Sequence, residues 1–268
     1  MINLDTQTGV KLTLFPDNQP HVQVEKNAGS DVTASLTNSI KLINLLQTVS
    51  LLAKPGTLTI PYLMAARYDR QMSEDKTDSF DLKLVASLIN ACGFSKVKIL
   101  DPHSPIALQL IDSSESITAT PGLFARYSKS YESPILICPD KGARDRAKEI
   151  QALFKLEEPV ICDKSRDQDG KISLVFPEVE KLRIKDRNCV IVDDLCDGGG
   201  TFLAISSQIS NQKSISLIIT HSIFSKGNNV FKEFDTVFTT DSYSDWTDAG
   251  KNITCVPWQE AADWKQND

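Results

Sequence analysis

The amino-acid sequence predicts an α/β protein with two domains, each built on a mostly parallel sheet flanked by helices. Short apolar runs rich in Val and Ile alternate with segments of helical periodicity, which is typical of parallel sheets covered on both faces. The chain has 268 residues, 41% hydrophobic and 24% charged, which is enough for two compact cores. A polar stretch with Pro and Gly at 112–122 is the expected junction, so we predict domains at 1–122 and 123–268.

The expected strands are short and largely apolar, as strands buried on both faces are. They are residues 57–60, 97–100, 135–138, 160–162, 189–192, 215–219 and 236–238. Two helices are predicted by apolar residues at i, i+3, i+4 and i+7. One covers residues 42–52 and ends before Pro55. The other covers residues 82–89, between Ser79 as its N-cap and Gly93.

The overall charge and the cysteines exclude several classes of protein. A formal net charge of -6 argues against nucleic-acid binding, which needs a basic surface. The six cysteines lack C-x-x-C spacing, so we expect reduced, buried thiols rather than disulfides or zinc ligands. Residues 1–14 do not resemble a signal peptide, and no apolar run is long enough to span a membrane. We therefore expect a cytoplasmic protein that binds neither nucleic acid nor membrane.

Polar residues follow five of the predicted strands, at the ends where α/β folds bind ligands. In chain order they are Arg67, Asp69 and Arg70; Asp101 and His103; Asp140; Lys164 and Arg166; and Asp193, Asp194 and Asp197. The carboxyl ends of parallel strands meet at one edge of a sheet. Carboxylates, a histidine and basic side chains at such an edge predict a site for a metal ion and phosphate groups.

The strongest local signal lies at residues 190–201, where a hydrophobic strand leads into acids, a glycine turn and a helix. Backbone N–H groups of such a turn can hold a phosphate, and the two adjacent acids suit the vicinal hydroxyls of a ribose. The residues expected to bind ribose phosphate are Asp193, Asp194, Asp197, Gly198, Gly199, Gly200 and Thr201. The alternative is a sharp turn that binds no ligand. The glycines alone would favour this alternative, but the complete pattern of residues 190–201 does not.

This string resembles the phosphoribosyl-diphosphate loop, V-x-x-D-D-x-x-D-T-A-G-T, of type I phosphoribosyltransferases and ribose-phosphate pyrophosphokinases. Further segments are similar to the pyrophosphokinases and keep their order from about residue 15 to 243. They are residues 61–70 (P-Y-x-x-Y-A-R-Q-D-R in the family), 83–86, 101–103 (D-L-H), 139–140 (S-P-D), 163–166 (D-K-R-R) and 220–225 (T-H-x-x-x-S).

The resemblance implies two tandem type I phosphoribosyltransferase-like domains, with final residues that can pack back on the first domain. It also implies an enzyme of nucleotide biosynthesis that transfers the β,γ-diphosphate of ATP to the 1-hydroxyl of ribose 5-phosphate and releases AMP.

The same resemblance implies roles for residues near the ATP. Arg67, Asp69 and Arg70 would bind ATP, because a guanidinium can grip a triphosphate. His103 and Asp140 would bind Mg²⁺, with His103 also close to the ATP; Mg²⁺ usually takes only one or two protein ligands besides phosphates. The alternatives are a surface ion pair of the arginines with Asp69 and a capping role for His103, and the position behind a strand weakens both.

Lys164 and Arg166 are similar to the mobile catalytic loop of the family. By this resemblance they would stabilise charge on the transferring phosphoryl group. The polar run at 165–170 is expected to order only on substrate binding, and a solvated β-turn is the alternative for Asp167 and Asp169.

Near the start of the chain, Phe15, Asp17 and Gln19 resemble the F-x-D/N-G-E segment of the family, with Gln19 in place of Glu. In the family this segment stacks on the adenine of a neighbouring subunit's ATP. The resemblance therefore implies at least a homodimer.

The main departure from the family is the glycine turn, where Gly198, Gly199 and Gly200 replace Thr-Ala-Gly. The change removes a hydroxyl and a methyl group and makes room beside the phosphate. We therefore consider ADP-ribose as a second acceptor. The chain would then resemble divergent members of the family that make ADP-ribose 1-diphosphate for the resynthesis of NAD⁺.

Two rival functions are a phosphoribosyltransferase and a non-catalytic regulator. A phosphoribosyltransferase would need the loop at Asp193 but not the segments at Arg67 and Lys164. A regulator that has lost catalysis would typically lack metal or loop residues, whereas His103, Asp140, Lys164 and Arg166 are all present. The full set of segments therefore favours an active pyrophosphokinase.

Overall fold

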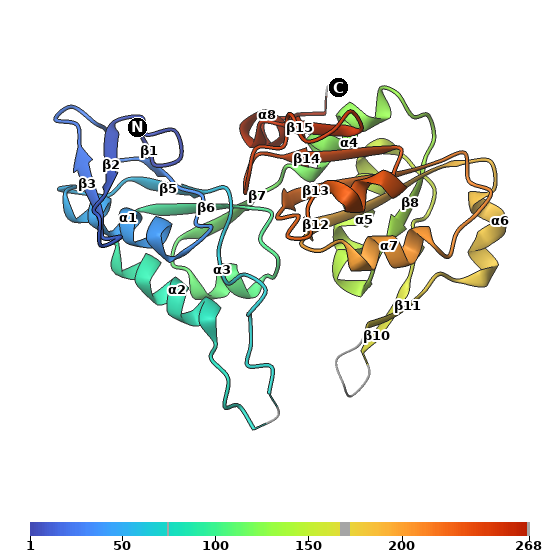
Figure 1. Cartoon of the computed structure of the whole chain (residues 1–268), viewed down its shortest axis with the longest axis horizontal. Helices are drawn as coiled ribbons and strands as arrows, with labels where there is room; N and C mark the ends of the chain where they lie inside the picture. The colour runs from blue at the N-terminus through green and yellow to red at the C-terminus, as the bar shows by residue number, and fades with distance from the viewer. Residues whose placement is uncertain (74, 167–171, 267–268) are drawn as a thin grey trace. The chain divides into compact units, whose positions relative to one another are not determined.

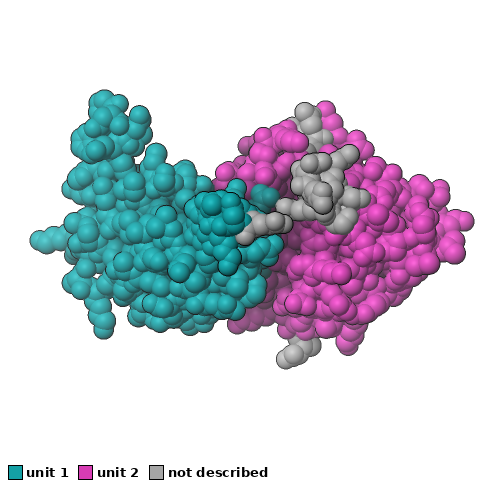
Figure 2. All heavy atoms as spheres, turned by 90° about the horizontal axis from the view of Figure 1, so that it is seen from below, with its two compact units in different colours: residues 1–117 teal, residues 118–268 magenta. Residues whose placement is uncertain are grey.

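The computed structural model describes residues 1–73, 75–166 and 172–266, and it divides into two compact units, 1–117 and 118–268 (Figure 2). The division lies a few residues before the predicted one. Helix α4 (Thr120–Ser128) begins within the predicted junction, and Pro121 and Gly122 lie in its first turn, where Pro is well tolerated. The buried Thr120 hydroxyl lies 3.2 Å from that of Thr220, so this segment packs within the second unit.

Unit 1 contains a five-stranded parallel sheet and a separate hairpin (Figure 1). In spatial order the sheet strands are β1 (Ile2–Asn3), β4 (Val32–Thr33), β5 (Thr57–Ile60), β6 (Lys96–Leu100) and β7 (Ser114–Ile117). The hairpin pairs β2 (Val10–Leu14) with β3 (Pro20–Val24), and the helices are α1 (Ser39–Ser50), α2 (Asp81–Ala91) and α3 (Ile106–Leu110).

Both predicted helices of unit 1 form. The side chain of Asn38 accepts a hydrogen bond from the Lys41 amide and starts α1. The predicted N-cap Ser79 is wrong: α2 begins at Asp81 behind Phe80, and the Ser79 hydroxyl bonds the Asp81 carboxylate instead of a backbone amide.

Unit 2 contains a six-stranded parallel sheet and a two-stranded antiparallel ribbon. In spatial order the sheet strands are β15 (Ile253–Val256), β14 (Thr236–Thr240), β13 (Ser214–Ser222), β12 (Asn188–Cys196), β8 (Ile135–Cys138) and β9 (Val160–Ile161). The ribbon pairs β10 (Asp163–Arg166) with β11 (Ile172–Val175). Besides α4, the helices are α5 (Arg144–Phe154), α6 (Lys181–Ile184), α7 (Gly200–Ser206), α8 (Trp258–Ala262) and the 3-10 turns η1 (Lys141–Ala143), η2 (Glu178–Glu180) and η3 (Asn228–Glu233).

The central strand β12 is longer than predicted. It continues through Asp193 and Asp194 because β13 stays paired with it as far as Cys196 opposite Ser222. Both acids therefore lie inside the strand rather than behind it, directly after the fully buried residues Val190 to Val192.

The last described residues pack on unit 2. Helix α8 lies against α4 at Gly122, where a Cβ atom would stand 2.1 Å from the Ala261 carbonyl oxygen. The Trp264 ring stacks on Phe154 at 5.3 Å. The missing side chain at residue 122 allows this close approach and holds the end of the chain on its own unit.

No helix within the described residues is long and apolar enough to cross a membrane.

Candidate active site

The glycine turn joins β12 to α7 and takes its shape from Gly199. This residue has φ 74°, in the left-handed region that favours glycine, and its carbonyl oxygen accepts the amides of Phe202 and Leu203 in the first turn of α7. A Cβ atom at Gly200 would meet nothing within 4 Å, so the space beside the turn is open there.

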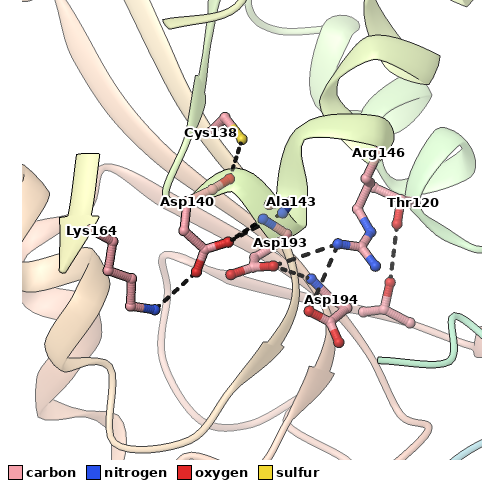
Figure 3. Close-up of polar contacts among 10 residues, drawn as sticks. Thr120, Cys138, Asp140, Ala143, Arg146, Lys164, Asp193 and Asp194 are labelled. Carbon is pink, nitrogen blue, oxygen red and sulfur yellow. Dashed lines mark hydrogen bonds and ion pairs between the residues drawn. The ribbon is translucent and has the colours of Figure 1, made fainter. Parts of the chain in front are cut away.

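Arg146 of α5 lies between the two acids of β12 (Figure 3). Its Nη1 atom is 3.5 Å from Asp193 Oδ1 and 3.7 Å from Asp194 Oδ1, and Asp193 Oδ1 also accepts the Asp194 amide at 2.9 Å. Burial raises the pKa of Asp193 well above its ordinary value, and the charge of Asp194 raises this pKa further, while Arg146 opposes the shift. Two acids thus share one cation and keep acceptor capacity for hydroxyl groups.

Asp140 follows β8 and holds Lys164 of β10 (Figure 3). One carboxylate oxygen caps η1 by accepting the amides of Gly142 at 2.9 Å and Ala143 at 3.2 Å, and the other accepts Lys164 Nζ at 2.9 Å. Burial pushes the pKa of Asp140 upward, but the hydrogen bond and charge of Lys164, with the two amides, lower it overall. The carboxylate is therefore ionised and the ammonium group is fixed in place.

The Asp140–Lys164 pair and the two acids belong to one site, because β8 and β12 are paired neighbours in the sheet. The charge of Asp140 contributes to the raised pKa of Asp193. Lys164 lies in a paired strand, whereas the sequence predicts a mobile loop there. Arg166 ends β10, but its side chain lies outside the described residues, as do Asp167 and Asp169.

The predicted ATP residues lie in three segments of unit 1. Exposed Arg67 and Arg70 and half-buried Asp69 follow β5. Exposed His103 follows β6, which pairs with β5.

The third segment is the tip of the β2–β3 hairpin. Phe15 is 52% exposed there; its amide donates to the Gln19 carbonyl, and Asp17 accepts the Gln19 amide. The ring of Phe15 therefore faces outward on a well-formed turn.

Thiol chemistry does not contribute to the site in unit 2. Burial raises the pKa of Cys138 and Cys196, which flank the acids, to about 12, so both stay protonated. All six cysteines are free, as predicted, and five are buried.

Comparison with known proteins identifies the family. A model of the phosphoribosyl transferase domain matches residues 108–257. The ribose-phosphate pyrophosphokinase of Aquifex aeolicus is 30% identical over 232 residues, which cover 81% of this chain and 73% of the relative. The chain belongs to the ribose-phosphate pyrophosphokinase family. The protein of the same name from Sulfurisphaera tokodaii is 26% identical over 229 residues, 80% of this chain and 77% of the relative.

A solved structure of another protein has the same fold as this chain. The phosphoribosylpyrophosphate synthetase of Mycobacterium smegmatis superposes with a TM-score of 0.75 at 16% identity, over 93% of this chain and 86% of that one. The α/β fold implied by the resemblance is confirmed, and the family is one of diphosphotransferase enzymes.

Arg146 contacts both acids of the site but was not predicted from the sequence. It stands in a run of charged residues, and such a run is typical of a solvated helix face. Its position relative to the buried residues of the helix could have revealed it. Arg146 follows buried Ala143 by three positions and precedes buried Ile150 by four, so it lies on the apolar stripe of the helix. A charge on that stripe needs a partner inside the protein.

The raised pKa of Asp193 leads to a testable expectation about stability. The native protein holds this proton more tightly than the unfolded chain does, so stability falls as pH rises above the ordinary carboxyl range. We expect D193N to be more stable than wild type at pH 7, by about 1 kcal/mol, while acceptor binding weakens. Thermal unfolding between pH 5 and pH 7 measures this, and the difference should shrink toward pH 5.

Asp248 provides the control, because it is exposed and D248N should unfold like wild type at both pH values. An unfolding temperature of D193N at or below that of wild type at pH 7 would contradict the burial of an unfavourable charge at Asp193.

Proposed function

We propose that the chain transfers the β,γ-diphosphate of ATP to the anomeric 1-hydroxyl of a ribose 5-phosphate moiety, with release of AMP. The observation that carries the proposal is the site of unit 2, in which Lys164 is fixed on Asp140 beside the Asp193, Asp194 and Arg146 group. The names of the relatives, ribose-phosphate pyrophosphokinases, support this reaction.

Each group of the site has a role in this reaction. Asp193 and Asp194 accept hydrogen bonds from the ring hydroxyls of the ribose, and the turn at 198–201 holds its phosphate. The 1-hydroxyl oxygen forms a bond to the β-phosphorus, the bond from that phosphorus to the oxygen of AMP breaks, and the hydroxyl proton is released. Lys164 stabilises the charge on the phosphoryl oxygens, which is the main task of a protein in phosphoryl transfer.

Unit 1 is proposed to supply the ATP site through Arg67, Asp69, Arg70 and His103. Exposed Phe15 at the hairpin tip suits stacking on an adenine of a second copy, so we propose a homodimer or larger homo-oligomer.

Magnesium is proposed to neutralise the phosphates of ATP. Within the described ranges, no group of three or more His, Cys, Asp or Glu side chains could hold a metal ion. Mg²⁺ is mostly held by phosphate oxygens and water, so one or two protein ligands would suffice. The ionised Asp140 of unit 2 and the exposed His103 of unit 1 are each proposed as a ligand of Mg²⁺.

The two rival functions fit the molecule less well. A phosphoribosyltransferase would not need Lys164 on Asp140, and the pyrophosphokinase relatives match about four fifths of the chain. A non-catalytic regulator would not need to retain Lys164, Asp140 and His103, and all three are present.

A second candidate acceptor, ADP-ribose, is favoured by the open space at Gly200. The test measures AMP release from Mg-ATP with ribose 5-phosphate and with ADP-ribose. We expect turnover with ribose 5-phosphate, and a kcat/KM for ADP-ribose at least as high if the glycine turn accepts an extended phosphate. Turnover with ribose 5-phosphate alone excludes the larger acceptor, and no AMP with either acceptor excludes the proposed reaction.

A further inference from the structure

Lys226 lies across the glycine turn. A Cβ atom built on Gly198 would stand 3.2 Å from both Cδ and Cε of Lys226 and 3.5 Å from its Cγ. The aliphatic stem of the lysine therefore lies directly beside the place that a side chain at residue 198 would take. A larger residue at this position would be in tight contact with the stem, which would have to shift by a few tenths of an ångström.

The path of Lys226 is set by a well-anchored turn behind β13. The Cys196 carbonyl oxygen accepts the amides of Ile223 at 2.9 Å and Phe224 at 3.2 Å, which ties this turn to the end of β12. Phe224 is 2% exposed and packs on Phe231 at 3.9 Å and on Trp246 at 4.9 Å. The backbone beside Lys226 is thus held by the core.

The end of the Lys226 side chain has the properties of a ligand-binding cation. The residue is exposed, and among the described residues no hydrogen bond or ion pair to its ammonium group is found. It lies over a turn that follows three acids, Asp193, Asp194 and Asp197, which by themselves repel a phosphate. A cation at this place offsets that repulsion.

We propose that Lys226 binds the phosphate on C5 of the acceptor and helps to select the acceptor, an inference that rests on the proposed function of the glycine turn. The shared chemistry is a phosphate ester on a ribose, carried either as a monophosphate or as the diphosphate of ADP-ribose. The stem lies against Gly198, and a Cβ atom at Gly200 would meet nothing within 4 Å, so a second phosphoryl group has room at the turn.

The test replaces Lys226 with Met, which keeps most of the stem and removes the charge. We expect KM for the acceptor to rise on the order of 10- to 100-fold in K226M, as for loss of a hydrogen bond to a charged group, with kcat unchanged. K226R should restore most of the affinity. The matched control is K213M, because Lys213 stands just before the opposite end of the same strand, and its KM should equal that of wild type.

The two acceptors distinguish the source of the phosphate. A larger loss with ADP-ribose than with ribose 5-phosphate assigns Lys226 to the second phosphoryl group, and an equal loss assigns it to the first. A KM within twofold of wild type for both acceptors overturns the inference.

A binding measurement separates this inference from the proposed reaction. Calorimetric titration of wild type and K226M with each acceptor needs no turnover. If wild type releases no AMP but binds an acceptor more tightly than K226M does, the proposed reaction fails and the role of Lys226 stands. Equal affinities, or no binding to wild type, overturn it.

Discussion

Replacing Lys164 with Ala is expected to lower the rate of AMP release by about 10³-fold or more, because phosphoryl transfer depends on cations placed at the developing charge. The fold should survive, since Asp140 keeps its hydrogen bonds from the Gly142 and Ala143 amides. The pair is only partly buried, with side chains 20% and 28% exposed, so its loss should cost no more than about 1 kcal/mol of unfolding free energy. Steady-state kinetics and denaturant unfolding measure the two effects.

Lys181 offers a matched control for this variant. Its ammonium group lies 2.7 Å from Glu178, but the two side chains are 40% and 79% exposed. K181A should therefore lose neither rate nor measurable stability. A K164A enzyme that releases AMP at the wild-type rate would show that another group stabilises the transferring phosphoryl group.

Replacing Arg146 with Met is expected to reduce both stability and activity. The Arg146 side chain is 16% exposed and lies near two carboxylates, whose side chains are 17% and 6% exposed. Removing one partner of a buried ion pair leaves uncompensated charge, which typically costs about 3 kcal/mol of unfolding free energy. The acids would also move apart or take up protons, so acceptor binding should weaken. Urea unfolding and acceptor titration measure these changes.

A double variant tests the cause of this loss. D193N/R146M removes the cation and one of the acids, so it should be more stable than R146M alone. Arg144, exposed on the same helix, is the matched control, and R144M should unfold like wild type. If the double variant is no more stable than R146M, packing of the arginine stem rather than its charge stabilises this part of the unit.

The fold class and the bounds of some strands could be predicted from the sequence because they depend on local patterns. The expected strands at 57–60 and 135–138 have the same bounds as β5 and β8, since short runs rich in β-branched and other apolar residues favour strands buried on both faces. The short or polar strands β1, β4, β7 and β10 were not predicted. These segments are strands because they pair with neighbouring strands, and their own residues do not form the apolar runs that predict a strand.

Sequence patterns alone were enough to predict an α/β member of the pyrophosphokinase family, with acids, a glycine turn and Lys164 near its strand ends. The folded chain was needed to learn which cation meets which partner: Lys164 with Asp140 across 24 positions, Arg146 with Asp193 across 47, and Lys226 with Gly198. The sequence and the folded chain differ in this way because a sequence motif indicates only which residues lie near the end of one strand. The order of strands and the phase of each helix bring distant side chains together, and both depend on how the whole unit packs.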